Sequence, residues 1–261
     1  MSRRPRWHSA ITNGLLPRRP VRRKKALGVR PVRSSLHFIG AGVALLLALS
    51  VLLVLALRWV DPPCSSFMLQ YSARNRLSAK TNHPLRYQWA PWEDIATEVK
   101  LAVIASEDQR FLTHRGFDFD SMYRAWSDHR GGESLRGAST ITQQTAKNLF
   151  LWPSRSLSRK ALEAYFTVLI EIFWSKRRIL EVYLNIAEFG QAVYGIESAS
   201  RAFFDKGPSD LTLREAALIA AVLPSPLRYS VRKPSAYLLG RVDWIIMQMR
   251  RLGGARYLRG L

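Results

Sequence analysis

The sequence has little cysteine, few acidic residues and none of the common catalytic signatures. A single cysteine, Cys64, excludes both a disulfide framework and a cysteine-cluster metal site. The sequence also has no phosphate-binding P-loop, no H-E-x-x-H zinc motif and no G-x-S-x-G nucleophile elbow. Its one Ser-x-x-Lys, at Ser230 and Lys233, lacks the partner motifs that a penicillin-binding site needs. Nucleotide hydrolysis, zinc proteolysis and transpeptidation are therefore disfavoured, which leaves carboxylate chemistry.

Acidic residues are absent from the first part of the chain, where positive charge is concentrated. The whole chain has 40 Lys and Arg against 19 Asp and Glu, and residues 1–33 hold 11 of the basic residues. Residues 36–57 follow without a formal charge, and these 22 residues would form a helix of about 33 Å. That length spans a bilayer, and the basic flank places residues 1–33 in the cytoplasm. No cleavage site follows, so we expect an uncleaved anchor.

Two other interpretations of this region are weaker. A buried core helix does not explain the arginine-rich flank before the apolar run, nor Arg58 and Trp59 after it. The basic tail could bind nucleic acid, but it has neither interleaved aromatic residues nor a recognisable motif, so we expect no nucleic-acid partner. The predicted organisation is a basic cytoplasmic tail (1–33), a transmembrane anchor (34–58), a juxtamembrane segment (59–84) and one globular domain (85–261).

The globular part has a helical pattern with few strand signals. Residues 95–107 place apolar side chains at helical spacing, and residues 159–186 form one long run of the same kind. Thr140 with Gln143, and Thr212 with Glu215, have the form of capping boxes that begin helices. A further helix begins at Ser235 and ends at Gly253. The predicted fold class is mostly α.

One segment is unusual because it is cationic and lacks acid. Residues 134–162 contain no Asp or Glu, and Glu163 follows directly. Arg159 and Lys160 lie four and three residues before Glu163, so the three side chains would share one face of a helix. Such a cluster is either a solvated ion pair of small energetic value or a groove for an anionic group such as a diphosphate.

Five motifs, in order, resemble those of the peptidoglycan glycosyltransferases. Residues 107–116 (EDQRFLTHRG) match the first motif and residues 137–144 (GASTITQQ) the second. RKALE (159–163), KRRILEVYLN (176–185) and GIESASRAFF (195–204) match the third, fourth and fifth. The match covers residues 85–255 without a transpeptidase domain, as in the monofunctional members. The resemblance implies a lysozyme-like α fold and polymerisation of lipid II into glycan strands by inverting transfer, with release of polyprenyl diphosphate.

The resemblance also implies roles for individual residues. Glu107 matches the catalytic base that accepts the proton of the acceptor hydroxyl. Glu163 matches a second carboxylate that would orient basic side chains, hold a divalent ion or polarise the acceptor. The diphosphate contacts would come from Lys147, Arg159 and Lys160, and contacts to sugar or phosphate from Thr140, Gln144 and Asn148. Asp108, Phe111 and His114 would shape the loop that presents Glu107.

The resemblance further implies a divalent cation, Mg²⁺ or Mn²⁺, without an organic cofactor. Its partners would be lipid II, the growing strand, the membrane and division or elongation proteins. The expected location is the inner membrane, as a single-pass protein with a periplasmic catalytic domain. Residues 117–133 mix apolar, aromatic and basic side chains, so they could form either a membrane-interface segment or a partly buried helix.

Two other functions remain as alternatives. A membrane-anchored lysozyme-like enzyme that cleaves glycan would share the fold and one acid, but it would not need the cationic segment before Glu163. A non-enzymatic membrane scaffold would not need both glutamates and the basic set, and all of these residues are present.

Overall fold

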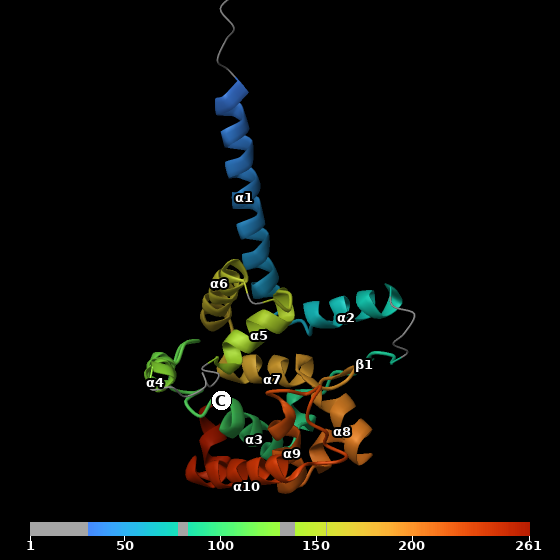
Figure 1. Ribbon diagram of the computed structural model, residues 1–261. Coiled ribbons are helices and arrows are strands. Elements are labelled where there is room, and N and C mark those ends of the chain that lie inside the picture. Colours follow the sequence, from blue (N-terminus) through green and yellow to red (C-terminus); the bar gives the residue numbers. More distant parts are fainter. Residues whose placement is uncertain (1–30, 78–82, 131–138, 155) are drawn as a thin grey trace, which may run out of the picture. The chain divides into compact units, whose positions relative to one another are not determined.

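The computed structural model describes residues 31–77, 83–130, 139–154 and 156–261, with the backbone alone for residues 31–36 and 128–130. The prediction of a mostly α fold is confirmed (Figure 1). The helices are α1 (Pro31–Ala56), α2 (Ser66–Leu77), α3 (Thr97–Glu107), α4 (Phe119–Arg130), α5 (Ile141–Phe150), α6 (Leu157–Phe173), α7 (Lys176–Ile186), α8 (Ile196–Phe204), α9 (Leu213–Val222) and α10 (Ala236–Arg251). Short 3₁₀ helices are η1 (Trp92–Asp94), η2 (Pro208–Asp210) and η3 (Gly254–Gly260).

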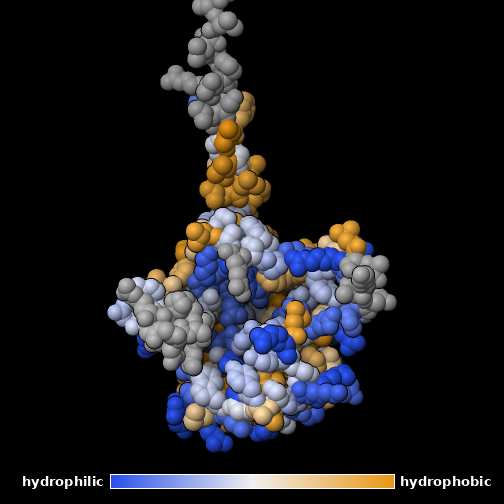
Figure 2. Space-filling view, in the orientation of Figure 1, coloured by the Kyte–Doolittle hydropathy of each residue, from blue (hydrophilic) through white to orange (hydrophobic). Residues whose placement is uncertain are grey.

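The chain divides into two compact units, residues 1–46 and 47–261, and α1 contributes to both. Within α1, His37–Ala56 is 20 residues long and apolar enough to cross a membrane. Its side chains are mostly exposed, and the surface of this helix is almost entirely hydrophobic (Figure 2). Exposed leucine and valine along a whole helix are not stable in water, which is consistent with a membrane anchor.

The larger unit is built from two groups of helices. One group packs α3 against α9 and α10, and the other packs α5 against α6, α7 and α2. Figure 1 shows the first group below α7 and the second group beside the end of α1. A small sheet completes the unit, with β3 (Val193–Tyr194) parallel to β1 (Arg86–Tyr87) and antiparallel to β2 (Glu188–Gly190).

The ends of the helices follow the predicted capping signals. Thr140 and Thr212 both form complete capping boxes, with Gln143 and Glu215 as their partners. Ser235 caps α10, where its side chain accepts a hydrogen bond from the Leu238 N–H. These polar caps fix where α5, α9 and α10 begin, because each satisfies backbone N–H groups that have no partner inside the helix.

The apolar run predicted over residues 159–186 forms two helices, α6 and α7, and not one continuous helix. Trp174 adopts an extended conformation at the end of α6, and the Ser175 hydroxyl accepts a hydrogen bond from the Arg178 N–H to start α7. Both helices have an apolar stripe, so the hydrophobic pattern continues across the break. The serine between them is the local signal that ends one helix and begins the next.

The last turns of α1 are hydrogen-bonded to α6 and α7 within the larger unit. The Ser50 hydroxyl lies 2.8 Å from the Tyr165 hydroxyl, and the Trp174 indole donates to the Val54 carbonyl over 2.7 Å. Arg178 donates to the carbonyls of Leu57 and Val60 and to Asp61. The helix that carries Arg159, Lys160 and Glu163 is therefore fixed to the end of the apolar helix.

Residues 119–130 form α4, whose apolar side chains lie on the surface. Phe119 and Tyr123 are 70% and 67% exposed, and Met122 and Trp126 are also exposed. The segment is therefore a helix, as one of the two interpretations expected, and most of its described apolar side chains are exposed. Residues 131–133 of the segment lie outside the described residues.

Candidate active site

A cleft of about 1110 Å³ lies between the two groups of helices. One wall carries Glu107 at the end of α3 together with Gln144 and Lys147 of α5. The other wall is formed by α10, and its lining side chains include Tyr237, Arg241 and Trp244. Two smaller pockets adjoin the cleft, one of 230 Å³ that shares Glu107 and one of 210 Å³ that shares Lys147. A cleft of this size, with a few charged groups on its wall, suits a substrate larger than one sugar.

The Glu107 carboxylate is buried and held from three directions. The Gln144 amide donates to one oxygen over 3.0 Å, and the Ser106 hydroxyl donates to the other over 3.0 Å. An Arg241 guanidinium nitrogen lies 3.7 Å from that second oxygen. Burial raises the pKa of Glu107, although the hydrogen bonds and Arg241 oppose the shift. A carboxylate with a raised pKa accepts a proton more readily, as a general base must.

Tyr183 of α7 orients Gln144. Its buried hydroxyl donates to the Gln144 carbonyl oxygen over 3.1 Å, which turns the amide nitrogen toward Glu107. Burial raises the pKa of Tyr183 well above 10.0, and the charge of Glu107 adds to the shift, so Tyr183 keeps its proton. Gln144 therefore always presents an N–H donor to the glutamate.

Replacing Tyr183 with phenylalanine should lower kcat about tenfold and leave KM little changed. The loss of the hydroxyl frees the Gln144 amide to rotate, so Glu107 loses its fixed donor without any change in the walls of the cleft. Steady-state kinetics measure this effect. Tyr123→Phe on exposed α4 is the matched control, and an equal loss in both variants would contradict the role of Tyr183.

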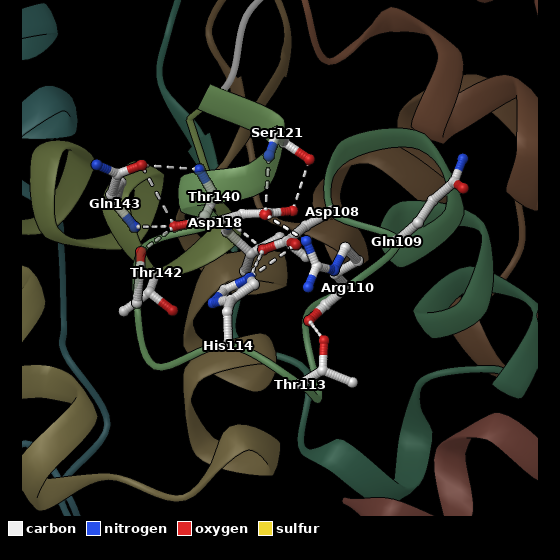
Figure 3. A network of polar contacts seen from close by, with 12 residues as sticks. Asp108, Gln109, Arg110, Thr113, His114, Asp118, Ser121, Thr140, Thr142 and Gln143 are labelled. Carbon is white, nitrogen blue, oxygen red and sulfur yellow. Dashed lines mark hydrogen bonds and ion pairs between the residues drawn. The ribbon is translucent and has the colours of Figure 1, made fainter. Parts of the chain in front are cut away.

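Asp108 and His114 form a buried pair in the loop that follows Glu107 along the chain (Figure 3). The His114 Nε2 lies 2.8 and 2.9 Å from the two Asp108 oxygens, and one of these oxygens accepts the Ile141 N–H over 3.0 Å. Phe111 is fully buried and meets the His114 ring edge-on. These contacts connect the loop after α3 to the first turn of α5.

The Thr140 hydroxyl is occupied within the protein. It accepts from the Gln143 N–H as the cap of α5 and donates to the Gly116 carbonyl over 2.6 Å. Its side chain is 2% exposed, although the residue lines the 230 Å³ pocket. Asn148 lies on the same helix and lines the 210 Å³ pocket beside Lys147.

The predicted cationic cluster is present on α6. Glu163 is buried, and its two oxygens accept hydrogen bonds from Arg159 and Lys160. The Arg159 side chain is also buried, whereas Lys160 is 46% exposed. The Arg159 Nε is buried and has no hydrogen-bond partner among the described residues. The basic residues Arg136 and Arg155 of the acid-free segment lie outside the described residues.

Lys147 connects this cluster electrostatically to Glu107. Burial lowers the pKa of Lys147, and the charges of Arg159 and Lys160 add to the shift, whereas Glu163 and Glu107 oppose it. The two carboxylates thus stabilise the lysine cation that lines the cleft. Because burial weakens its hydration, this cation gains more from an arriving anion than an exposed lysine would.

Within the described residues, the site holds no preformed cluster of side chains for a divalent ion. No group of three or more His, Cys, Asp or Glu side chains lies close enough together in the described part of the chain. Glu163, the carboxylate that the resemblance offers for such an ion, already accepts from two cations.

Several residues of the site were not expected from the sequence. Arg241 is the most important of them, since its guanidinium also donates to the Ser106 hydroxyl over 2.9 Å. Nothing in its local pattern distinguishes it from any other arginine on a helix. Tyr183 lies in the fourth motif, so the sequence did indicate that this residue could have a role. Glu188 lines the 210 Å³ pocket, and burial raises its pKa to about 7.

Comparison with known proteins gives a consistent result. The transglycosylase family model matches residues 74–250. A biosynthetic peptidoglycan transglycosylase of Pseudomonas putida is 50% identical over 212 residues, 81% of this chain and 89% of that protein. The protein of the same name from Xanthomonas campestris pv. campestris is 47% identical over 236 residues, 90% of this chain and 96% of that protein. The chain therefore belongs to the transglycosylase family of peptidoglycan glycosyltransferases.

Proposed function

We propose that this enzyme polymerises lipid II, with Glu107 as the base and the cluster of Lys147, Arg159 and Lys160 as the site for the departing diphosphate. The observation that carries the proposal is the position of Glu107 and Lys147 in one cleft, with buried Arg159 and Glu163 coupled to Lys147. One wall thus offers a proton acceptor and a cation, which are the two groups that glycosyl transfer from a diphosphate needs.

The reaction follows from these two groups. The acceptor's 4-hydroxyl gives its proton to Glu107 while its oxygen bonds to the anomeric carbon of the donor. The bond from that carbon to the diphosphate oxygen breaks on the opposite face, so the α linkage becomes β. The electron pair leaves with the polyprenyl diphosphate, whose charge the basic cluster stabilises. Arg159 would act in this step through the positive charge of its guanidinium.

The remaining residues have supporting roles. Gln144 fixes the Glu107 carboxylate, and Asn148, which lines the pocket beside Lys147, would bind the substrate. Glu163 orients Arg159 and Lys160, because each of its oxygens accepts from one of them. Asp108, Phe111 and His114 hold the loop that presents Glu107, and Thr140 caps the helix behind it. Any Mg²⁺ or Mn²⁺ that assists then enters with the substrate, whose phosphate oxygens are its preferred ligands.

The apolar helix would anchor the enzyme in the inner membrane. Its basic flank favours a cytoplasmic N-terminus and a periplasmic catalytic domain. Tethering raises the concentration of enzyme at the leaflet that carries a lipid-linked substrate. The same location would bring the enzyme to the proteins of cell division or elongation.

The raised pKa of Glu107 predicts that Glu107→Gln is more stable than the wild type at neutral pH. Keeping a buried carboxylate ionised costs folding free energy, and the wild type recovers this energy only as pH falls through the folded pKa. The difference in Tm should therefore be largest above that pKa and vanish below about pH 4, the usual range of a glutamate. Thermal unfolding from pH 4 to pH 8 measures it, and a variant less stable than the wild type at pH 8 would contradict the prediction.

The proposed function is tested with purified full-length protein in detergent and fluorescent lipid II. We expect a polymer that lysozyme digests, and no shortening of glycan strands added in place of lipid II. Cleavage of those strands without polymer formation would instead support the lytic alternative.

A further inference from the structure

The side chains of α10 that line the cleft, apart from Arg241, have no role in the bond-forming chemistry proposed above. Leu238, Val242, Ile245 and Met249 form the stripe of α10 that is buried in the core. A second stripe lines the cleft and consists of Tyr237, Gly240, Arg241 and Trp244, hereafter the α10 wall. Its members are spaced by three, one and three residues, so they share one helical face.

Two aromatic rings of the α10 wall are exposed in the cleft. Tyr237 is 62% exposed and Trp244 is 39% exposed. Tyr237 stacks on Tyr229 with ring centroids 5.7 Å apart, and the Arg241 guanidinium lies 5.9 Å from the centre of the Trp244 ring. Both rings are therefore held in place while a face stays open to the cleft. Large aromatic surfaces held exposed in a cavity usually mark a binding site.

Gly240 lies between the two rings, inside a helix, where glycine is unfavourable. Glycine costs roughly 0.5–1 kcal/mol against alanine at such a position. A Cβ added to Gly240 would meet no atom within 4 Å, so packing within the protein does not require the glycine. The space in front of it is open cleft. The glycine therefore leaves room for a ligand to approach the backbone closely at this point.

The two walls of the cleft differ in chemistry. The wall opposite α10 carries Ser106, Gln144 and Lys147, which bind by hydrogen bonds and charge. The α10 wall presents the aromatic faces of Tyr237 and Trp244, and its one cation, Arg241, is directed at Ser106 and Glu107. A sugar ring has both kinds of surface, since its hydroxyl and amide groups project from the edge and its C–H bonds from the face. A polyprenyl chain would instead be matched by two apolar walls.

We propose that the α10 wall binds the sugar rings of the glycan strand, with Tyr237 and Trp244 as stacking platforms and Gly240 as the gap between them. The inference rests on the proposed function, because it assigns a subsite to the growing strand of that same reaction. Tyr237 and Trp244 are seven residues apart, about 10 Å along a helix, which suits more than one ring. The wall would hold the strand between successive additions.

The test compares glycan binding and product length in two double variants. Tyr237→Ala with Trp244→Ala removes both rings. Leu239→Ala with Met247→Ala removes two exposed side chains of α10 that do not line the cleft. We expect the first variant to bind a soluble β-1,4-linked N-acetylglucosamine hexamer about tenfold more weakly, as for two lost aromatic contacts. It should also make shorter polymer, whereas the control matches the wild type in both measurements.

Gly240→Leu gives a second test that does not depend on removing aromatic packing. The leucine enters open space and favours the helix, so the fold and Tm are retained while the gap is filled. We expect weaker hexamer binding and shorter polymer. A wild type that polymerises lipid II but does not bind the hexamer would overturn the inference, as would a ring-deleted variant with unchanged hexamer binding and product length. A selective loss of polyprenyl diphosphate binding would assign the wall to the lipid instead. Failure of the proposed function can be distinguished from failure of this inference, because the wild type would then form no polymer.

Discussion

Glu107→Gln should abolish polymer formation, with kcat reduced by at least about 10²–10⁴ and lipid II binding retained. Glutamine has nearly the same shape and can still accept the hydrogen bond from Gln144, but it cannot take a proton from the acceptor hydroxyl. The walls of the cleft and the basic cluster are unchanged, so the substrate should still bind. Polymer yield and lipid II affinity, measured on the same preparation, separate the two effects.

Asp94→Asn is the matched control for this prediction. It makes the same carboxylate-to-amide change on η1, at an exposed position that does not line the cleft. We expect wild-type turnover from it. Residual turnover of Glu107→Gln close to that of the control would assign proton transfer to another group.

Arg159→Ala should lower kcat/KM about 100-fold, mainly because the variant reacts less efficiently with the donor substrate. The substitution removes a buried cation, and it leaves Glu163 paired only with Lys160. Both changes make the site less favourable for the negative charge that develops on the diphosphate. Because Lys160 remains as a partner, the loss of stability should stay below the roughly 3–5 kcal/mol typical of breaking an isolated buried ion pair. The loss in kcat/KM is measured by kinetics with varied donor concentration, and the loss of stability is measured by thermal unfolding.

Arg201→Ala provides a control with the same geometry. Arg201 and Glu197 are also four residues apart on one helix, but Arg201 is 62% exposed. Glu197 is buried but Arg201 is open to solvent, which screens the pair, so the variant should lose little stability and keep wild-type turnover. Equal losses in the two variants would mean that Arg159 acts through folding alone.

Much of the fold could be predicted because its signals are local. Capping residues such as Thr140, Thr212 and Ser235 act within their own first turn, and the charge-free run of α1 needs no tertiary information. The break between α6 and α7 was missed because the apolar pattern continues through it. Its signal is one serine, and a serine after a helical run is common enough to be overlooked. The exposure of α4 depends on what packs beside it, which its own sequence does not contain.

The site residues that lie in sequence motifs could be predicted. The residues that only tertiary packing brings to the site could not. Glu107, Lys147 and Glu163 belong to stretches with a recognisable order along the chain. Arg241 comes from a helix 134 residues further on than Glu107, and only the packing of α10 on α3 brings it to 3.7 Å. The aromatic residues of the α10 wall were likewise hidden, since a tyrosine and a tryptophan on an amphipathic helix are usually part of a core. Their exposure becomes evident only in the folded cleft.

The most direct measurement counts the products of bond formation by the wild-type enzyme. Full-length protein is mixed with lipid II that is labelled in both the sugar and the lipid, and the new glycosidic bonds and the released polyprenyl diphosphate are quantified together over time. We expect one diphosphate for each bond formed, in a polymer that lysozyme digests. Polymer without equivalent release of diphosphate, or release of diphosphate without polymer, would contradict glycosyl transfer from the lipid-linked donor in this cleft.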